Sequence, residues 1–184
     1  LGLKCKLPQT FHHNYYLGNN YRDYSNQVFT NFNSLQKPYY YVNVLSKHNA
    51  ECAPEGCETL FFVCPVPDLR FKSDWSDRDQ VVDSIIDDFS AKIKKDIRPE
   101  IISRTVYTPE DWQNQFNLHR GSGLGLSHKM LQIGGFRPKN FDEHFKNVFY
   151  VGASTVPGTG LPMAIISSKL AVERVEKYSS DTKH

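Results

Sequence analysis

The chain has 184 residues, with 22 Lys and Arg against 20 Asp and Glu and a formal net charge of +2. This length corresponds to one ordinary domain or slightly more, which excludes a large multidomain enzyme. The nearly neutral charge argues against a dedicated nucleic-acid-binding protein, which would carry a basic stripe. No apolar run in the sequence is long enough for a membrane-spanning helix, and no basic segment precedes an apolar one as in a secretory signal.

The first third of the chain alternates strand-like and helical segments. Aromatic and β-branched residues predict strands at residues 10–17, 39–45 and 57–66. The spacing of apolar residues predicts a short helix at residues 24–32.

The clearest helix covers residues 77–97, because its apolar residues recur every three or four positions and form one stripe. These residues are Val82, Ile85, Ile86, Phe89, Ile93 and Ile97. Ser76 and Asp79 resemble a capping box at its start, and we expect Pro99 to end it. We interpret the opposite face as a solvated surface. Its charged residues are Asp83, Asp87, Lys94 and Lys95.

The second half adds two strand-like and two helical segments. Strands are predicted at residues 100–107 and 148–152. One helix begins with Thr108 as N-cap and acidic residues in its first turn, and a last helix covers residues 161–177. This irregular alternation predicts an α+β fold with an antiparallel or mixed sheet.

The four cysteines indicate whether to expect a metal site and which cellular compartment suits the protein. Cys52 and Cys57 are spaced too widely for a zinc knuckle and no second pair follows, so we expect no metal site. Cys64 lies in an apolar segment and is interpreted as a small core residue. Few cysteines and no signal favour a cytoplasmic location.

Two glycine-rich stretches are candidate ligand-binding loops. Residues 148–163 run from a strand through a turn with glycines into a helix start, which suits an anion or a flavin ring. An ordinary tight connection fits the same residues, and Met163 replaces the last glycine of a dinucleotide fingerprint. Residues 121–126, followed by His128, form either a loop packed against a large ligand or a flexible connector.

No acid–base pair stands out, so the catalytic residues stay unknown. His12 and His13 lie in a predicted strand, and we expect their side chains to point to opposite faces without sharing a metal. Ser122 lacks the nucleophile elbow of serine hydrolases.

A series of short motifs occurs in a fixed order and resembles the C-terminal part of the bacterial-type phytoene desaturases, which are FAD-dependent carotenoid dehydrogenases. The motifs are His12-His13-Asn14, Ala53-Pro54-Glu55-Gly56-Cys57-Glu58, Pro65-Val66-Pro67, Asp74-Trp75, Thr108-Pro109-Glu110-Asp111, Gly121-Ser122 with Gly125-Leu126-Ser127-His128, Phe136-Arg137-Pro138, Val151-Gly152-Ala153-Ser154-Thr155, Pro157-Gly158-Thr159-Gly160 and Pro162-Met163. Each motif alone is weak, but the ordered set is specific and covers nearly the whole chain.

The resemblance implies a longer, two-domain flavoprotein of which this chain is a piece, expected to be inactive by itself. It assigns residues 1–146 to the substrate-binding domain, residues 147–178 to the last segment of the FAD-binding domain, and residues 179–184 to a polar tail. The expected cofactor-binding residues are Gly152, Ala153, Ser154, Thr155, Pro157, Gly158, Gly160, Pro162 and Met163. The expected substrate-binding residues are Gly121, Ser122, Gly123, Leu124 and His128.

The implied reaction is the desaturation of a phytoene- or diapophytoene-type polyene by hydride transfer to FAD, with the cofactor supplying the chemistry. The expected partner is an apolar polyene rather than nucleic acid, with peripheral association at the inner face of the cell membrane. A related flavin-dependent carotenoid oxygenase or isomerase, or a non-enzymatic domain that binds apolar ligands or partner proteins, remains an alternative.

Overall fold

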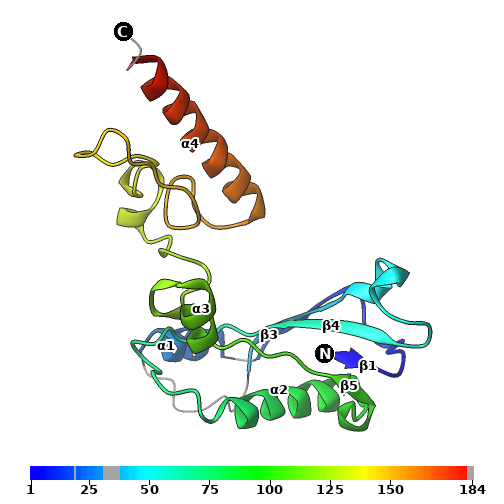
Figure 1. The fold of residues 1–184 in the computed structure, drawn as a ribbon. Coiled ribbons are helices and arrows are strands. Elements are labelled where there is room, and N and C mark those ends of the chain that lie inside the picture. The colour runs from blue at the N-terminus through cyan, green and yellow to red at the C-terminus, as the bar shows by residue number, and fades with distance from the viewer. Residues whose placement is uncertain (19, 31–37, 182–184) are drawn as a thin grey trace. The chain divides into compact units, whose positions relative to one another are not determined.

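The computed structural model describes residues 1–18, 20–30 and 38–181 (Figure 1). The chain divides into two compact units, Leu1–Gly121 and Ser122–His184. The α+β class is confirmed, since helices accompany a single five-stranded sheet.

The sheet of the first unit is antiparallel, with the strand order β2-β3-β4-β1-β5. The strands are β1 (Gly2–Leu3), β2 (His13–Tyr16), β3 (Tyr40–Val44), β4 (Glu58–Val63) and β5 (Ile101–Ser103). Strands are thus confirmed within four predicted segments, each shorter than expected. The short β1 joins β4 to β5, which lies far from β4 in the sequence.

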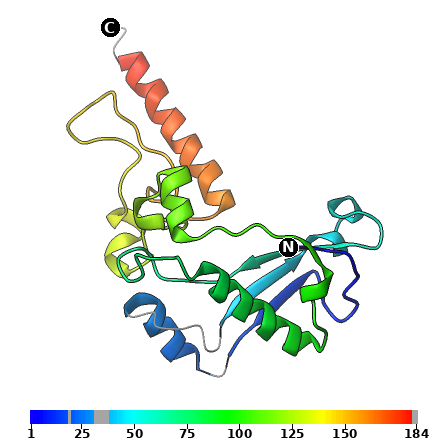
Figure 2. The same cartoon turned by 60° about the horizontal axis from the view of Figure 1, so that its bottom comes forward.

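The core of the first unit lies between the sheet and helix α2 (Arg78–Ile93), which runs along one sheet face (Figures 1 and 2). Alternate residues of β3, among them Val42 and Val44, are fully buried there against Phe89, which is also fully buried. The apolar side chains that recur every second residue in the strands therefore pack in one cluster with those that recur about every 3.6 residues in α2. The Cys64 side chain packs against this cluster.

The opposite sheet face carries exposed side chains in the described part of the first unit and is rich in aromatic residues. The register aligns Tyr15 with Tyr41 and Val63, and it aligns Asn43 with Phe61. Tyr15 and Phe61 are 71% and 57% exposed. The sheet is therefore two-sided, with an apolar face toward α2 and an aromatic face that no element covers among the described residues of its own unit.

Both predicted boundaries of α2 need correction. Its N-cap is Asp77, whose carboxylate makes no capping hydrogen bond and instead binds Lys72. Ser76 does not cap the helix, since its N–H and hydroxyl donate to the Asp74 carboxylate. The helix ends at Ile93, where Lys94 adopts the left-handed conformation with φ of 54°. Pro99 follows in a separate 3₁₀ turn, so it does not end α2.

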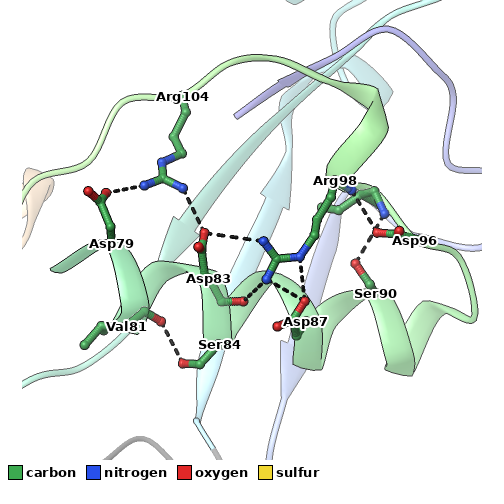
Figure 3. A network of polar contacts seen from close by, with 10 residues as sticks. Asp79, Val81, Asp83, Ser84, Asp87, Ser90, Asp96, Arg98 and Arg104 are labelled. Atoms are coloured by element: carbon green, nitrogen blue, oxygen red, sulfur yellow. Dashed lines mark hydrogen bonds and ion pairs between the residues drawn. The ribbon is translucent and has the colours of Figure 1, made fainter. Parts of the chain in front are cut away.

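The acidic face of α2 is not simply solvated, since it binds two arginines that follow it in the chain (Figure 3). Arg98 forms an ion pair with Asp87 at 2.7 Å, and Arg104 one with Asp83 at 2.9 Å. Arg104 also pairs with Asp79, one turn earlier. These pairs fasten the segment that contains β5 along α2.

The remaining helices of the first unit are short. Helix α1 (Tyr21–Thr30) begins earlier than expected, and predicted residues 31 and 32 lie outside the described residues. Helix α3 (Pro109–Phe116) confirms the predicted start: Thr108 and Asp111 form a reciprocal capping box, with Pro109 in the first turn.

The second unit consists mainly of turns and one long helix, α4 (Leu161–Asp181). The helix confirms the prediction and continues into the expected tail, whose last three residues lie outside the described residues. The strand predicted at residues 148–152 is wrong: only an isolated bridge between Phe141 and Phe149 forms. A strand requires a ladder of neighbours, and in the described chain this segment pairs only with residues 140–142. In the part of the chain that the structure describes, no helix is long and apolar enough to cross a membrane.

Candidate functional site

The predicted cofactor turn, residues 152–160, has a backbone that glycine alone adopts readily. Gly152, Gly158 and Gly160 have φ values of 119°, 131° and 126°. A Cβ at Gly152 would meet no atom within 4 Å, whereas one at Gly158 would lie 2.9 Å from Nε2 of His128. The turn is therefore open at Gly152 and closely packed at Gly158.

A buried polar network ties this turn to α4. The Gly152 N–H donates to Oγ of Ser167 at 3.1 Å, and the hydroxyls of Ser167 and Thr155 lie 3.0 Å apart. The Thr155 hydroxyl also contacts the Gly152 carbonyl at 2.8 Å, and Nδ2 of Asn140 lies 3.2 Å from both hydroxyls. Of the two hydroxyls predicted to reach the cofactor, that of Thr155 is buried in protein contacts, while Ser154 is exposed.

The predicted substrate residues divide between the two units. Gly121 ends the first unit with φ of 67°, and a Cβ there would lie 2.0 Å from the Pro109 carbonyl oxygen. Gly121 thus has a packing role beside α3. The other four residues, Ser122, Gly123, Leu124 and His128, belong to the second unit.

Within the second unit, residues 122–128 pack directly against the 152–160 turn. A Cβ at Gly125 would lie 2.9 Å from Oγ of Ser154, and the Thr159 hydroxyl donates to the Leu124 carbonyl. The structure therefore brings the predicted substrate loop and the predicted cofactor turn side by side.

The side chain of Arg137 forms hydrogen bonds with both of these segments. It is only 2% exposed, and its five N–H groups donate to five backbone carbonyls. Nε binds the carbonyl of Thr155 at 2.9 Å, Nη1 those of Ser127 and Gln132 at 3.3 and 2.9 Å, and Nη2 those of Leu126 and Ala153 at 3.1 and 2.5 Å. Hydrogen bonds to a charged group contribute about 1.5–3 kcal/mol each, which offsets the cost of burying the guanidinium.

The role of Arg137 was missed from the sequence, although its motif was noted. A single arginine between Phe136 and Pro138 carries no periodic signal of burial, and arginine is almost never fully buried unless paired. Its role becomes visible only in the folded chain, where five backbone carbonyls surround the guanidinium.

A short loop next to Arg137 holds a carboxylate in its charged form. Asp142 accepts hydrogen bonds from the Tyr150 hydroxyl at 2.5 Å and from the N–H groups of Phe145 and His144 at 2.9 and 2.8 Å. These donors, the hydroxyl above all, lower the pKa of Asp142 from 3.8 to about 2. This loop and Arg137 line a shallow hollow of about 440 Å³, which does not contain the 152–160 turn.

The expectation for the histidine pair is wrong. His12 precedes β2, so the alternation of a strand does not apply, and its ring lies 4.0 Å from that of His13. The ring of His48 stacks on the other side of His12 at 4.9 Å. Desolvation, followed by the neighbouring His13 and His48, lowers the pKa of His12. Across the described residues, no group of three or more His, Cys, Asp or Glu side chains has the geometry of a metal site.

Comparison with known proteins places the whole chain in one group. It is 40% identical over 97% of its length to a zeta-carotene-forming phytoene desaturase of Myxococcus xanthus, covering 35% of that protein. It is 32% identical over 94% of its length to a phytoene desaturase of Fusarium fujikuroi, and 31% identical over 90% to a 4,4'-diapophytoene desaturase (4,4'-diaponeurosporene-forming) of Staphylococcus aureus. The chain covers 34% of each of these two proteins.

No protein-family model matches the chain. The chain spans about a third of the length of the curated relatives it matches. The resemblance seen in the motifs is confirmed: over 90–97% of its length the chain is similar to phytoene and diapophytoene desaturases.

Proposed function

We propose that the chain is part of an FAD-dependent enzyme that desaturates a phytoene- or diapophytoene-type polyene. The observation that carries the proposal is the 40% identity to a phytoene desaturase across 97% of the chain. A match over 97% of the chain includes both units and both glycine-rich segments, rather than one common motif.

The 152–160 turn and the start of α4 fit one edge of a flavin cofactor. The space beside Gly152 is open, and a Cβ at Gly160 would meet only Cγ of Met163, at 3.8 Å, so a flat ring system can approach the backbone there. Pro162 has no N–H, which leaves the N–H groups of Leu161 and Met163 at the positive end of a long helix. Such groups favour an electron-rich ligand.

Bound FAD would accept the hydride, and the chain's own residues would hold and orient it. For this role we propose Gly152, Ala153, Ser154, Thr155, Pro157, Gly158, Gly160, Pro162 and Met163. Backbone groups dominate this set, since Ala153 has no polar side chain and Thr155 turns inward. The set therefore positions the cofactor and offers no side-chain acid or base.

An apolar polyene requires apolar contacts rather than charged ones. The 122–136 segment exposes such side chains next to the proposed cofactor turn: Leu124, Met130 and Leu131 are 72%, 83% and 75% exposed. We propose that this segment, with the neighbouring Ser122, Gly123 and His128, contributes to the polyene site. Gly121 directly precedes this segment in the chain and packs against Pro109 at the end of the first unit.

We further propose that residues 1–146 belong to the substrate domain and residues 147–178 to the FAD domain of the longer protein. The long exposed helix α4 supports this assignment, because Ser167 is its one buried residue and Leu161 and Ile165 are 81% and 67% exposed. We propose a cytoplasmic location with peripheral contact to the membrane in which the polyene dissolves.

The proposal is tested by purifying the complete polypeptide that carries this segment. We expect about one FAD per polypeptide on denaturation and conversion of phytoene or diapophytoene, supplied in lipid vesicles, to products with more conjugated double bonds. The isolated 184-residue chain is the matched control and should release no FAD. A well-folded complete protein without flavin would contradict the proposal, and oxygenated or merely isomerised products would indicate a related activity instead.

A further inference from the structure

We infer that Arg137 is a positioning residue that fixes the separation between the proposed substrate loop and the proposed cofactor turn. The inference rests on the proposed function, which assigns one segment to the substrate and the other to the cofactor. It adds that one side chain holds the two segments at a fixed distance from each other.

The geometry carries the inference, because the five bonds of Arg137 are shared between the two segments. Three carbonyls, those of Leu126, Ser127 and Gln132, belong to the 122–132 segment. Two carbonyls, those of Ala153 and Thr155, belong to the cofactor turn. A guanidinium is planar and rigid, so carbonyls bound to one guanidinium are held at one mutual spacing.

The way in which the charge of Arg137 is balanced also supports the inference. The described ion pairs of the second unit involve Lys139, His144 and Lys169, while Arg137 binds carbonyl oxygens alone. The positive charge is therefore balanced by backbone dipoles that only the folded loops supply. Loss of the charge would leave five carbonyls without their donor, and both loops would relax together.

Lysine is not an equivalent replacement at this position. Its ammonium group has three donors on a flexible stem, whereas Arg137 uses five donors in a fixed plane. Arg137→Lys keeps the charge and should keep the fold, but it cannot span both segments. A misplacement of about 1 Å between reacting groups can cost about 100-fold in rate.

The test uses the complete polypeptide with Arg137→Lys, and Arg104→Lys as the matched control. Arg104 forms ion pairs with Asp79 and Asp83 of α2 in the first unit and belongs to neither loop. We expect Arg137→Lys to lower kcat about 100-fold, with a smaller change in KM for phytoene and weaker retention of FAD. The control should retain the wild-type values.

Hydrogen exchange supplies a readout that needs no flavin. In Arg137→Lys the amides of residues 126–132 and 153–155 should both exchange faster, while those of β3 stay protected. If the lysine variant does not fold, Arg137→Ala refolded with and without methylguanidinium replaces it, and the added cation should restore protection in both segments.

Wild-type kcat and unchanged exchange in Arg137→Lys would overturn the inference, as would faster exchange in one segment alone. A wild-type protein that binds no FAD would instead overturn the proposed function. Hydrogen exchange in the wild type and in Arg137→Lys would then still show whether Arg137 holds the two loops together.

Discussion

Asp142 illustrates how single residues set the local electrostatics of the second unit. Its side chain is 21% exposed, and three donors hold its pKa near 2. Because this pKa lies below the ordinary value of 3.8, the carboxylate favours folding fully above about pH 4 and loses that contribution as the pH falls toward 2.

Replacement of Tyr150 tests this account directly. The Tyr150 hydroxyl is the largest cause of the lowered pKa, so Tyr150→Phe should raise the pKa of Asp142 toward 3.8. A carboxyl NMR titration of the two proteins measures both midpoints. Equal midpoints would show that the hydroxyl does not bind the carboxylate.

Replacement of Gly121 tests whether this residue has a packing role or a ligand-binding role. Its φ of 67° and the short approach to the Pro109 carbonyl leave no room for a methyl group. Gly121→Ala should lower the free energy of unfolding by about 2 kcal/mol or more. The control is Gly135→Ala, where a Cβ would meet nothing within 4 Å. Equal urea midpoints for the two variants would refute the packing role.

At the scale of elements, prediction succeeded where the signal is local. The stripe of α2 and the capping box of α3 depend on neighbours within a few residues, so both are visible in the sequence. The end of α2 is not visible in the sequence, because it depends on Lys94 in a left-handed conformation that non-glycine residues adopt rarely. The expected strand at residues 148–152 does not form, because in the described chain the segment makes only the isolated bridge between Phe141 and Phe149 and no ladder.

The packing of α2 on one sheet face gives a quantitative prediction. Phe89 is fully buried, and Phe89→Ala should cost about 3–5 kcal/mol of stability. Phe61 lies on the uncovered face and is 57% exposed, so Phe61→Ala should cost under about 1 kcal/mol. Urea unfolding followed by tryptophan fluorescence compares the two, and similar losses would mean that the sheet faces have been assigned incorrectly.

At the scale of the whole chain, the two units differ in how much core each contains. The buried apolar cluster consists entirely of residues of the first unit. The second unit relies on a buried polar network and Arg137, and its helix α4 buries one residue. Sequence composition cannot reveal this difference, because apolar residues such as Leu161 and Ile165 read as core but are exposed.

Residues 1–121 should therefore fold without the second unit. We expect this shortened chain to unfold cooperatively in urea and to give dispersed amide resonances, since it retains the sheet and the cluster around α2. The counterpart, residues 122–184, should show little cooperative unfolding. An unfolded 1–121 chain would contradict the division into units.

The central claim is that this segment serves a flavoenzyme that oxidises a polyene. Its most direct test is anaerobic mixing of the complete, FAD-loaded polypeptide with phytoene or diapophytoene in lipid vesicles. The account predicts that the visible absorbance of the flavin bleaches as a more conjugated polyene forms, because the hydride leaves the substrate for the cofactor. A flavin that stays oxidised with both polyenes, in a protein that binds them, would contradict it.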